Sequence, residues 1–467
     1  MAIDFGDIQS NVLRGWGAYG ETLRHVAYAF LSFGDGSGAR AWLAKTASVV
    51  TSCDAFDALA RGDAKDRFVW NLGLTNAGLA LFRVDVPASF KCYPAYVNGA
   101  VSRSKNYALL GDDGASAPER WHPYFRDPEL HAVVSISGWE PEGITRALGV
   151  LADSLRNARG VSQLALEHGN ALRGDVEHFG FKDGISQPRI EFGPQPPPAN
   201  EFCVNAPTQA TWDGVPPGEF VLGYDDVLRH TPTKDELLVN GSFLVFRKLH
   251  EDVAAFRTFL AALAERTGEL EEWLAAKFVG RWRSGAPLAL AWNSDNADLA
   301  DRNDFGYADD PDGFKTPFGA HIRRANPRDS ANSPTQVQTS AHRIIRRATP
   351  YGDALPAGAT DDGKERGVLF AVINGDIDRQ FEFVQANWIN SPISSNTLTS
   401  EADRDPLIGA NDGTGKLMIP RPDGPLFAWD LPRFVTVRGS AYFFLPGLRA
   451  LTSLAGAHSG AKAGASE

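Results

Sequence analysis

The sequence predicts an α+β fold, and three features of the chain support that prediction. Apolar runs with the length of buried strands recur along the 467 residues. Segments with the apolar spacing of an amphipathic helix lie between these runs. Hydrophobic residues make up 43% of the chain and Phe alone occurs 28 times, which is enough for large aromatic cores. Alternating strands and helices of this kind are typical of an α+β sandwich.

The first half of the chain begins the alternation with the run HVAYAFLSF, which predicts a strand over residues 25–33. We expect further strands at 68–74 and 132–137, and helices at 39–50 and 142–157. Each helix follows a strand, so that its apolar face can cover the sheet.

The second half repeats this order. SFLVFRKL predicts a strand over 242–249, and apolar residues from 253 to 263 share one helical face. Strands are expected again at 367–374 and 434–445, on either side of a helix at 379–388. The two halves therefore look like two versions of one α+β unit.

Residues 193–218 concentrate proline and polar residues, which resist both helix and sheet and so predict a connection. We place a domain boundary there, with one domain over 1–200 and a second over 201–455. Residues 456–467 are small and polar and are expected to form a flexible tail.

Composition and charge exclude several classes of protein. The formal net charge of -11 disfavours a nucleic-acid binder, which needs an excess of Lys and Arg. No apolar run reaches the roughly 18 residues of a membrane span, and the N-terminal residues do not resemble an export signal. A cytoplasmic protein without a membrane partner is the expectation. Cys53, Cys92 and Cys203 form no CxxC pair, which disfavours a disulfide framework and covalent cofactor attachment.

The stretch GDVEHFGFKDGISQP, residues 174–188, mixes turn formers, aromatic residues and charges in a way that neither a helix nor a strand requires. It contains the pattern GxxDG at 180–184. That pattern alone is weak, because Asp-Gly is a common turn dipeptide and a second copy, GANDG, occurs at 409–413. The residues around the first copy are the informative part.

With GFKDGISQP in view, the chain resembles the dye-decolorizing peroxidase family. Five further stretches agree in the same order, namely GEFVLGY, NGSFLVFRKL, KFVGRWRSGAPL, FGAHIRRANPR and HRIIRRATPYG. The resemblance implies two ferredoxin-like domains with one haem b per chain, held mainly by the second domain. It also implies hydrogen peroxide as oxidant, and aromatic donors such as dyes and phenols as reducing substrates.

Among the ten histidines, the resemblance selects His321 in PFGAHIRRANP as the axial ligand of the haem iron. Haem peroxidases hold iron through a neutral imidazole, whose other nitrogen usually donates to a carboxylate. The family motif implies Asp405, in DPLIGAND, as that carboxylate. His342 is the competing ligand, and its place beside an arginine motif makes it the weaker choice.

On the other face of the haem the resemblance implies Asp183 and Arg346, with Arg347 as the alternative if the register is shifted by one residue. Cleavage of the peroxide O–O bond requires a proton to move from one oxygen to the other while negative charge develops on the leaving group. A carboxylate can carry that proton, and a fixed guanidinium can stabilise the charge. Asp183 and Arg346 are the predicted catalytic pair.

Four other residues are expected near the haem. Gly184 lets the backbone approach the ring closely. Val368 and Phe370 align with residues that wall the cavity in the family, although a strand core explains them equally well. Arg323, in the HxR pattern after His321, is expected to pair with a haem propionate, with a solvated surface arginine as the alternative.

Two other functions compete with a peroxidase. One is a haem-handling protein that binds haem or removes its iron, as a deferrochelatase does, with little peroxidase turnover. The other is a degenerate α+β scaffold that binds no haem. The presence of Asp183, His321 and Arg346 together favours the peroxidase, since carrying haem requires no acid–base pair beside it.

Overall fold

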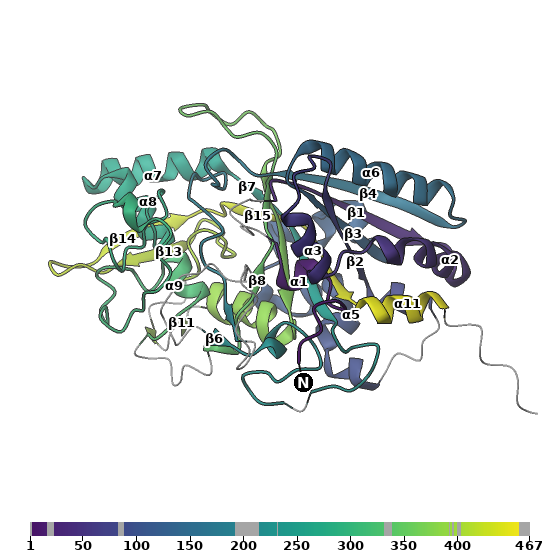
Figure 1. Cartoon of the computed structure of the whole chain (residues 1–467). Coiled ribbons are helices and arrows are strands. Elements are labelled where there is room, and N and C mark those ends of the chain that lie inside the picture. The colour runs from purple at the N-terminus through teal and green to yellow at the C-terminus, as the bar shows by residue number, and fades with distance from the viewer. Residues whose placement is uncertain are drawn as a thin grey trace, which may run out of the picture.

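A computed structural model of the chain describes residues 2–15, 23–82, 88–191, 214–230, 232–330, 339–391, 393–394, 397–398 and 403–456. Its centre is a nine-stranded sheet that runs through the whole molecule (Figure 1). The strand order is β4-β1-β3-β2-β15-β7-β10-β8, and β9 pairs with β10. Helices cover this sheet, so the predicted α+β class is confirmed.

The strands of the central sheet come from both halves of the chain. They are β1 His25–Phe33, β2 Phe68–Leu74, β3 Ala132–Gly138, β4 Val161–Asn170, β7 Ser242–Glu251, β8 Ile345–Arg346, β9 Thr349–Tyr351, β10 Gly367–Asn374 and β15 Val435–Leu445. Three small two-stranded sheets lie outside it. They pair β5 Arg189–Ile190 with β6 Gly214–Val215, β11 Ile393–Ser394 with β12 Thr397–Leu398, and β13 Gly415–Ile419 with β14 Leu426–Leu431.

Each half arranges its strands in the same way. In the first half the order is β4-β1-β3-β2, with α2 (Gly36–Thr46) after β1 and α6 (Pro141–Arg156) between β3 and β4. In the second half the order is β15-β7-β10-β8, with α7 (Val253–Thr267) and α8 (Glu271–Val279) after β7. The two halves meet where β15 pairs with β2 through Phe444 and Leu74.

Helices lie beside the sheet along its length (Figure 1). Around the N-terminal strands and along the sheet lie α1 Ser10–Leu13, α2 Gly36–Thr46, α3 Cys53–Ala60, α4 Asn76–Ala80, α5 Pro94–Asn106, α6 Pro141–Arg156 and α11 Leu448–Gly456. The C-terminal half carries α7 Val253–Thr267, α8 Glu271–Val279, α9 His321–Ala325 and the π-helical turns Asp378–Glu382 and Val384–Ile389.

Both faces of the sheet are buried. Alternate residues of β1 point to opposite faces, and accordingly Ala29 and Leu31 belong to one apolar core while Tyr28 and Phe30 belong to another. A sheet covered on both faces requires apolar residues at nearly every position. This explains why the strand runs are so clear in the sequence.

The predicted strands at 25–33, 68–74 and 367–374 are confirmed at both ends. The helix predicted over 39–50 is α2. It begins at Gly36, earlier than expected, because the Asp35 side chain accepts the N–H groups of Ser37 and Gly38 and caps the helix. The proposed boundary region lies largely outside the described residues, as does the tail beyond Gly456.

Candidate active site

Asp183 sits in a tight turn built by the stretch 174–188. Gly180 and Gly184 have φ values of 94° and 80°, in the region that favours glycine. The N–H of Asp183 donates to the carbonyl of Asp175 at 3.0 Å, which closes the turn. The two glycines differ in what they face. A Cβ on Gly180 would lie 3.3 Å from Arg283 Nε, whereas one on Gly184 would meet no atom within 4 Å, so Gly184 borders open space.

Arg346 contacts Asp183 from the end of β8. Its Nη1 donates to Asp183 Oδ1 at 2.7 Å and its Nη2 to the carbonyl of Ser186 at 3.2 Å. The side chain of Gln187 makes two hydrogen bonds with the backbone of Arg346. Its Nε2 donates to the carbonyl of Arg346, and its Oε1 accepts the N–H of Arg346. The segment ISQP thus holds the predicted catalytic pair together. The roles of Ser186 and Gln187 were not predictable from the sequence.

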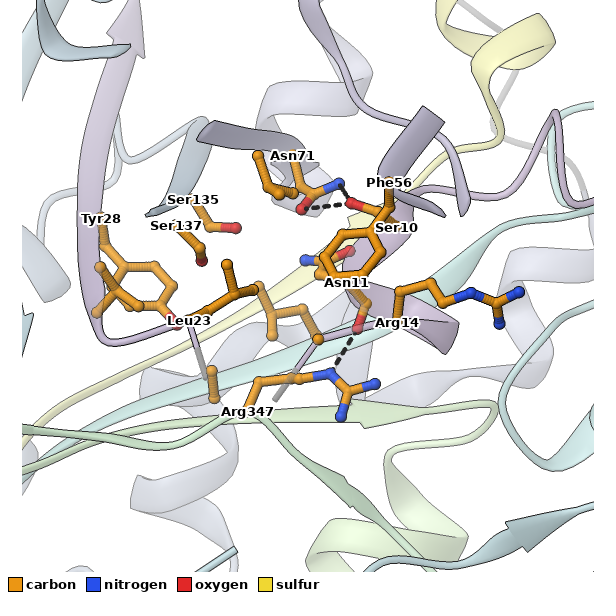
Figure 2. A pocket seen from close by; sticks show the side chains of 15 residues that line it. Ser10, Asn11, Arg14, Leu23, Tyr28, Phe56, Asn71, Ser135, Ser137 and Arg347 are labelled. Carbon is orange, nitrogen blue, oxygen red and sulfur yellow. Dashed lines mark hydrogen bonds between the residues drawn. The ribbon is translucent and has the colours of Figure 1, made fainter. Parts of the chain in front are cut away.

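Arg347 points to the opposite face of the sheet. Its Nε donates to the carbonyl of Asn11 at 2.9 Å, on the wall of a separate cavity that Tyr28 and Ser135 also line (Figure 2). Adjacent residues of a strand face opposite sides, so Arg346 and Arg347 cannot both reach Asp183. Of the two arginines that the sequence left open, the structure brings Arg346 to Asp183.

His321 begins the short helix α9. Its Nδ1 lies 2.8 Å from Asp405 Oδ2. Asp405 has no exposed surface, and its other oxygen accepts the N–H groups of Leu407 and Ile408 at 2.9 Å. Within the described part of the chain the Nε2 atom of His321 makes no hydrogen bond. The pair leaves one ring nitrogen available to a ligand.

The two pairs lie near each other. The side chains of Asp183, Arg346 and His321 are 38%, 27% and 29% exposed. The charges of Arg346 and Asp183 act on the pKa of His321, which places the three groups within electrostatic range of one another. This arrangement sets an acid–base pair within electrostatic range of a histidine.

The pKa shifts in the site follow from these contacts. Burial raises the pKa of the Asp183 carboxyl, but the charge and hydrogen bond of Arg346, with the N–H of Gly184, more than offset it, and the pKa lies below its ordinary value. Burial likewise opposes ionisation of Asp405, and the charge of His321 reverses the effect, so this pKa is also lowered. The imidazole of His321 is affected in the opposite sense, because Asp405 outweighs burial and raises its pKa.

Val368 and Phe370 lie on the sheet face that carries Arg346. Arg346 pairs directly with Val372 in the ladder between β8 and β10. Paired residues share a face, and so do residues two apart in one strand. Val368 and Phe370 therefore point to the same side as the Arg346 side chain.

Arg323 is held by other residues of the chain, and its contact with a haem propionate stays a prediction. Only 1% of it is exposed, so it is not a solvated surface arginine. Its Nη1 donates to Asp310 Oδ2 at 3.0 Å and to the carbonyl of Thr316 at 2.7 Å, while the guanidinium lies over the rings of Tyr307 and Phe318. These contacts give Arg323 a structural role in fixing the loop before α9.

His342 stacks on Phe383 with 3.6 Å between ring centroids, and its Nδ1 is 2.5 Å from the carbonyl of Arg379. Burial lowers its pKa to about 4. The second GxxDG copy ends in a surface turn, where Asp412 accepts the hydroxyl of exposed Thr414. Neither His342 nor Asp412 joins the pairs around Asp183 and His321.

Comparison with known proteins places the chain among peroxidases. It is 30% identical to a dye-decolorizing peroxidase of Mycena epipterygia, over 98% of this chain and 88% of that protein. It is also 30% identical to the multifunctional dye peroxidase DyP2 of an Amycolatopsis species, over 96% of this chain and 95% of that protein. A deferrochelatase of Yersinia pestis is 32% identical, over only 45% of this chain and 36% of that protein. No family model matches the chain.

The solved structures agree with the sequence relatives. An ancestral D-type dye-decolorizing peroxidase superposes with a TM-score of 0.80 at 26% identity, covering 97% of this chain and 99% of the other. A dye-decolorizing peroxidase in complex with 2,6-dimethoxyphenol gives a TM-score of 0.79 at 26% identity, covering 97% and 100%. Within the described residues no helix is long and apolar enough to cross a membrane. The chain belongs to the dye-decolorizing peroxidases, a family of haem enzymes, and is itself a peroxidase.

Proposed function

We propose that this peroxidase binds one haem b per chain between His321 and the pair Asp183–Arg346, and uses hydrogen peroxide to oxidise aromatic donors such as dyes and phenols. The observation that carries the proposal is the proximity of the two pairs. A histidine with one nitrogen committed to Asp405 lies within electrostatic range of an aspartate bonded to an arginine.

The residues present fit a haem. His321 offers Nε2 as an axial ligand, and its Nδ1–H donates to Asp405, the partner that fixes the tautomer of such ligands and raises their basicity. Gly184 leaves open space where any side chain would project. Among the described residues no cluster of three or more His, Cys, Asp or Glu could hold a bare metal ion. When bound, haem supplies an iron that takes peroxide and a ring that shares the oxidising equivalents.

Asp183 carries the proton in this proposal. Its Oδ1 accepts both Arg346 Nη1 and the N–H of Gly184. Its Oδ2 makes no hydrogen bond among the described residues, and it is the oxygen we assign to take a proton from one peroxide oxygen and return it to the other. Arg346 keeps further N–H groups for the negative charge that develops on the leaving oxygen.

We propose further that the two halves are ferredoxin-like domains, 1–200 and 201–455, followed by a tail at 456–467. The same strand order in each half supports this division. The second domain would supply His321, Asp405 and Arg346, and thus most of the haem contacts. The turn with Asp183 would come from the first domain. Val368 and Phe370 would wall the haem cavity from the sheet side.

The similarity to solved peroxidases supports aromatic donors for this chain. One of its structural relatives was solved with 2,6-dimethoxyphenol, and we propose phenols of that class as donors here. The haem-handling alternative has weaker support, because the similarity to deferrochelatase covers under half of the chain. The haem-handling alternative also assigns no function to the hydrogen bond between Arg346 and Asp183.

Absorption spectroscopy of the purified protein tests the proposal. A haem protein with a histidine ligand should show a Soret band, and one equivalent of hydrogen peroxide should change that band within seconds. Adding 2,6-dimethoxyphenol should then restore the starting spectrum. A protein that takes up no haem contradicts the proposal, and one whose Soret band ignores peroxide supports the haem-handling alternative.

A further inference from the structure

Two glutamates, the part-buried Glu177 and the buried Glu251, lie near Asp183. Glu177 belongs to the turn that carries Asp183. Its carboxylate oxygens accept the N–H groups of Phe179 and Phe181, both at 2.8 Å. Glu251 is the last residue of β7, and its carboxyl accepts the N–H of His178, the neighbour of Glu177. The turn therefore brings the carboxyls of Asp183, Glu177 and Glu251 within electrostatic range of one another.

Among the described residues Glu251 forms no ion pair with a cation. It is 7% exposed, and its Oε2 is buried without a hydrogen-bond partner in the described part of the protein. The ionisable side chains that interact with it there are Glu177, Asp183 and Tyr351, none of which is a cation. An unpaired carboxylate buried beside other carboxylates is strongly disfavoured, so such a group takes up a proton.

The other charges around the three carboxyls are already engaged. Arg346 is bonded to Asp183. Arg283 acts on Glu177 but forms its own ion pair with Glu272. Burial and the charge of Asp183 raise the pKa of Glu177 to about 7, even though two backbone N–H groups lower it. Burial and the charge of Glu177 raise the pKa of Glu251 well above its ordinary value. Protonation of Glu251 would remove the negative charge from a carboxyl whose Oε2 has no hydrogen-bond partner among the described residues.

Peroxidase turnover consumes protons at the site where peroxide is reduced. The overall reaction is H₂O₂ + 2 e⁻ + 2 H⁺ → 2 H₂O. When the electrons come from a donor that stays outside, its protons are released outside as well, and the protons for water must reach the peroxide side separately. Asp183 holds only one proton at a time. A second acid behind it would supply the next.

We propose that Glu251 stores a proton that passes through Glu177 to Asp183 during turnover. The step is Glu251–COOH + Asp183–COO⁻ → Glu251–COO⁻ + Asp183–COOH, after which a proton from solvent restores Glu251. Glu251 and Glu177 act through Asp183 and are positioning residues. The proposal rests on the proposed role of Asp183 as proton carrier.

Infrared spectroscopy tests the store itself. The holoenzyme at pH 7 should show the carbonyl stretch of a protonated carboxylic acid, sensitive to D₂O, that is lost in Glu251→Gln. Glu167→Gln is the matched control, because Glu167 is a part-buried glutamate already paired with Lys248. The band should survive in that variant. A spectrum in which Glu251→Gln removes no such band overturns the proposal.

Kinetics with ferrocyanide, a donor that carries no proton, tests delivery. Because Asp183 remains in place, Glu251→Gln should leave the rate of reaction with peroxide within about twofold and lower kcat by about tenfold, less than the ~10²–10⁴-fold that a direct acid–base group contributes. The loss should grow as the pH rises, since external protons become scarce. An unchanged kcat and pH profile overturns the proposal.

Two further variants keep the test decisive. If Glu251→Gln does not fold, Glu177→Gln interrupts the same path and should lower kcat in the same way. A normal kcat in that variant would exclude the path. Asp183→Asn separates the two levels of inference. If it leaves the reaction with peroxide unchanged, the proposed role of Asp183 fails. If it slows that reaction while the glutamate variants behave as wild type, only the proton store fails.

Discussion

Arg346 Nη1 lies 2.7 Å from Asp183 Oδ1, although 163 residues separate the two in the chain. Three further hydrogen bonds hold this geometry. Gln187 makes two with the backbone of Arg346, and the carbonyl of Ser186 accepts one from the second Nη of Arg346. The guanidinium is thus fixed before any substrate arrives. Charge stabilisation by a preorganised donor costs no rearrangement during the reaction.

Replacing Asp183 by Asn should slow the reaction with hydrogen peroxide by ~10²–10⁴-fold, because the amide cannot accept the proton. The amide oxygen can still accept the hydrogen bond from Arg346, so haem content should stay at the wild-type level. Stopped-flow measurement of the Soret change after mixing with peroxide gives the rate. A rate equal to that of the wild type would remove Asp183 from the mechanism.

The two candidate haem ligands can be separated by paired substitutions. His321→Ala should give a folded protein with little haem and no Soret band. His342→Ala should keep its haem, because that ring packs against Phe383 and its Nδ1 is bonded to a backbone carbonyl. Haem content measured per chain distinguishes them. The ligand assignment is wrong if the two variants show the reverse behaviour.

Asp405→Asn tests the carboxylate behind the ligand. Loss of an outer partner of this type typically weakens metal affinity or activity by 10–100-fold, and we expect a haem affinity lower by about that factor. Haem transfer to apomyoglobin measures the change. Asp412→Asn, in the surface turn of the second GxxDG copy, is the control and should retain haem as the wild type does.

The reaction with hydrogen peroxide should be insensitive to moderately acidic pH. Asp183 acts as a base only when it is ionised, and Arg346 holds its pKa below the ordinary value of 3.8. The base therefore stays available as the pH falls, and the rate of reaction with peroxide should remain nearly level from pH 7 to about 5 and decline only near or below pH ~4, the ordinary pKa of Asp. A His base would instead lose activity around pH ~6.5.

His178 is the histidine that such a pH profile would implicate. Its Nε2 lies 2.8 Å from the carbonyl of Tyr351, and burial lowers its pKa. His178→Gln should therefore leave the profile unchanged. A titration centred near pH ~6.5 that disappears in this variant would identify His178 as the base in place of Asp183.

The parts of the fold that the sequence predicted are those with a strong local pattern. β1 and β10 are buried on both faces, so nearly every residue is apolar and the ends of the run are clear. β4, over Val161–Asn170, was missed because it is a sheet edge that carries Gln163, Glu167 and His168, and its apolar signal is broken.

Within the site, predictability depended on motifs. The positions of Asp183, Arg346 and His321 came from the family resemblance, since no local pattern reports a contact across 163 residues. The burial of Arg323 was not predicted, because two adjacent arginines follow His321 and the sequence does not say which way each points. Its partner Asp310 lies in a loop whose path only the folded chain fixes.

The adjacent arginines of β8 and its continuation offer the most direct test of the central claim, that the Asp183–Arg346 pair performs the peroxide chemistry. Arg346→Leu should keep its haem and react with hydrogen peroxide about a hundredfold more slowly or worse, since one preorganised donor is worth ~3 kcal/mol. Arg347→Leu, altered on the opposite face of the same sheet, should react at close to the wild-type rate in the same stopped-flow experiment. Equal rates for the two variants, or a larger loss for Arg347→Leu, would contradict the account.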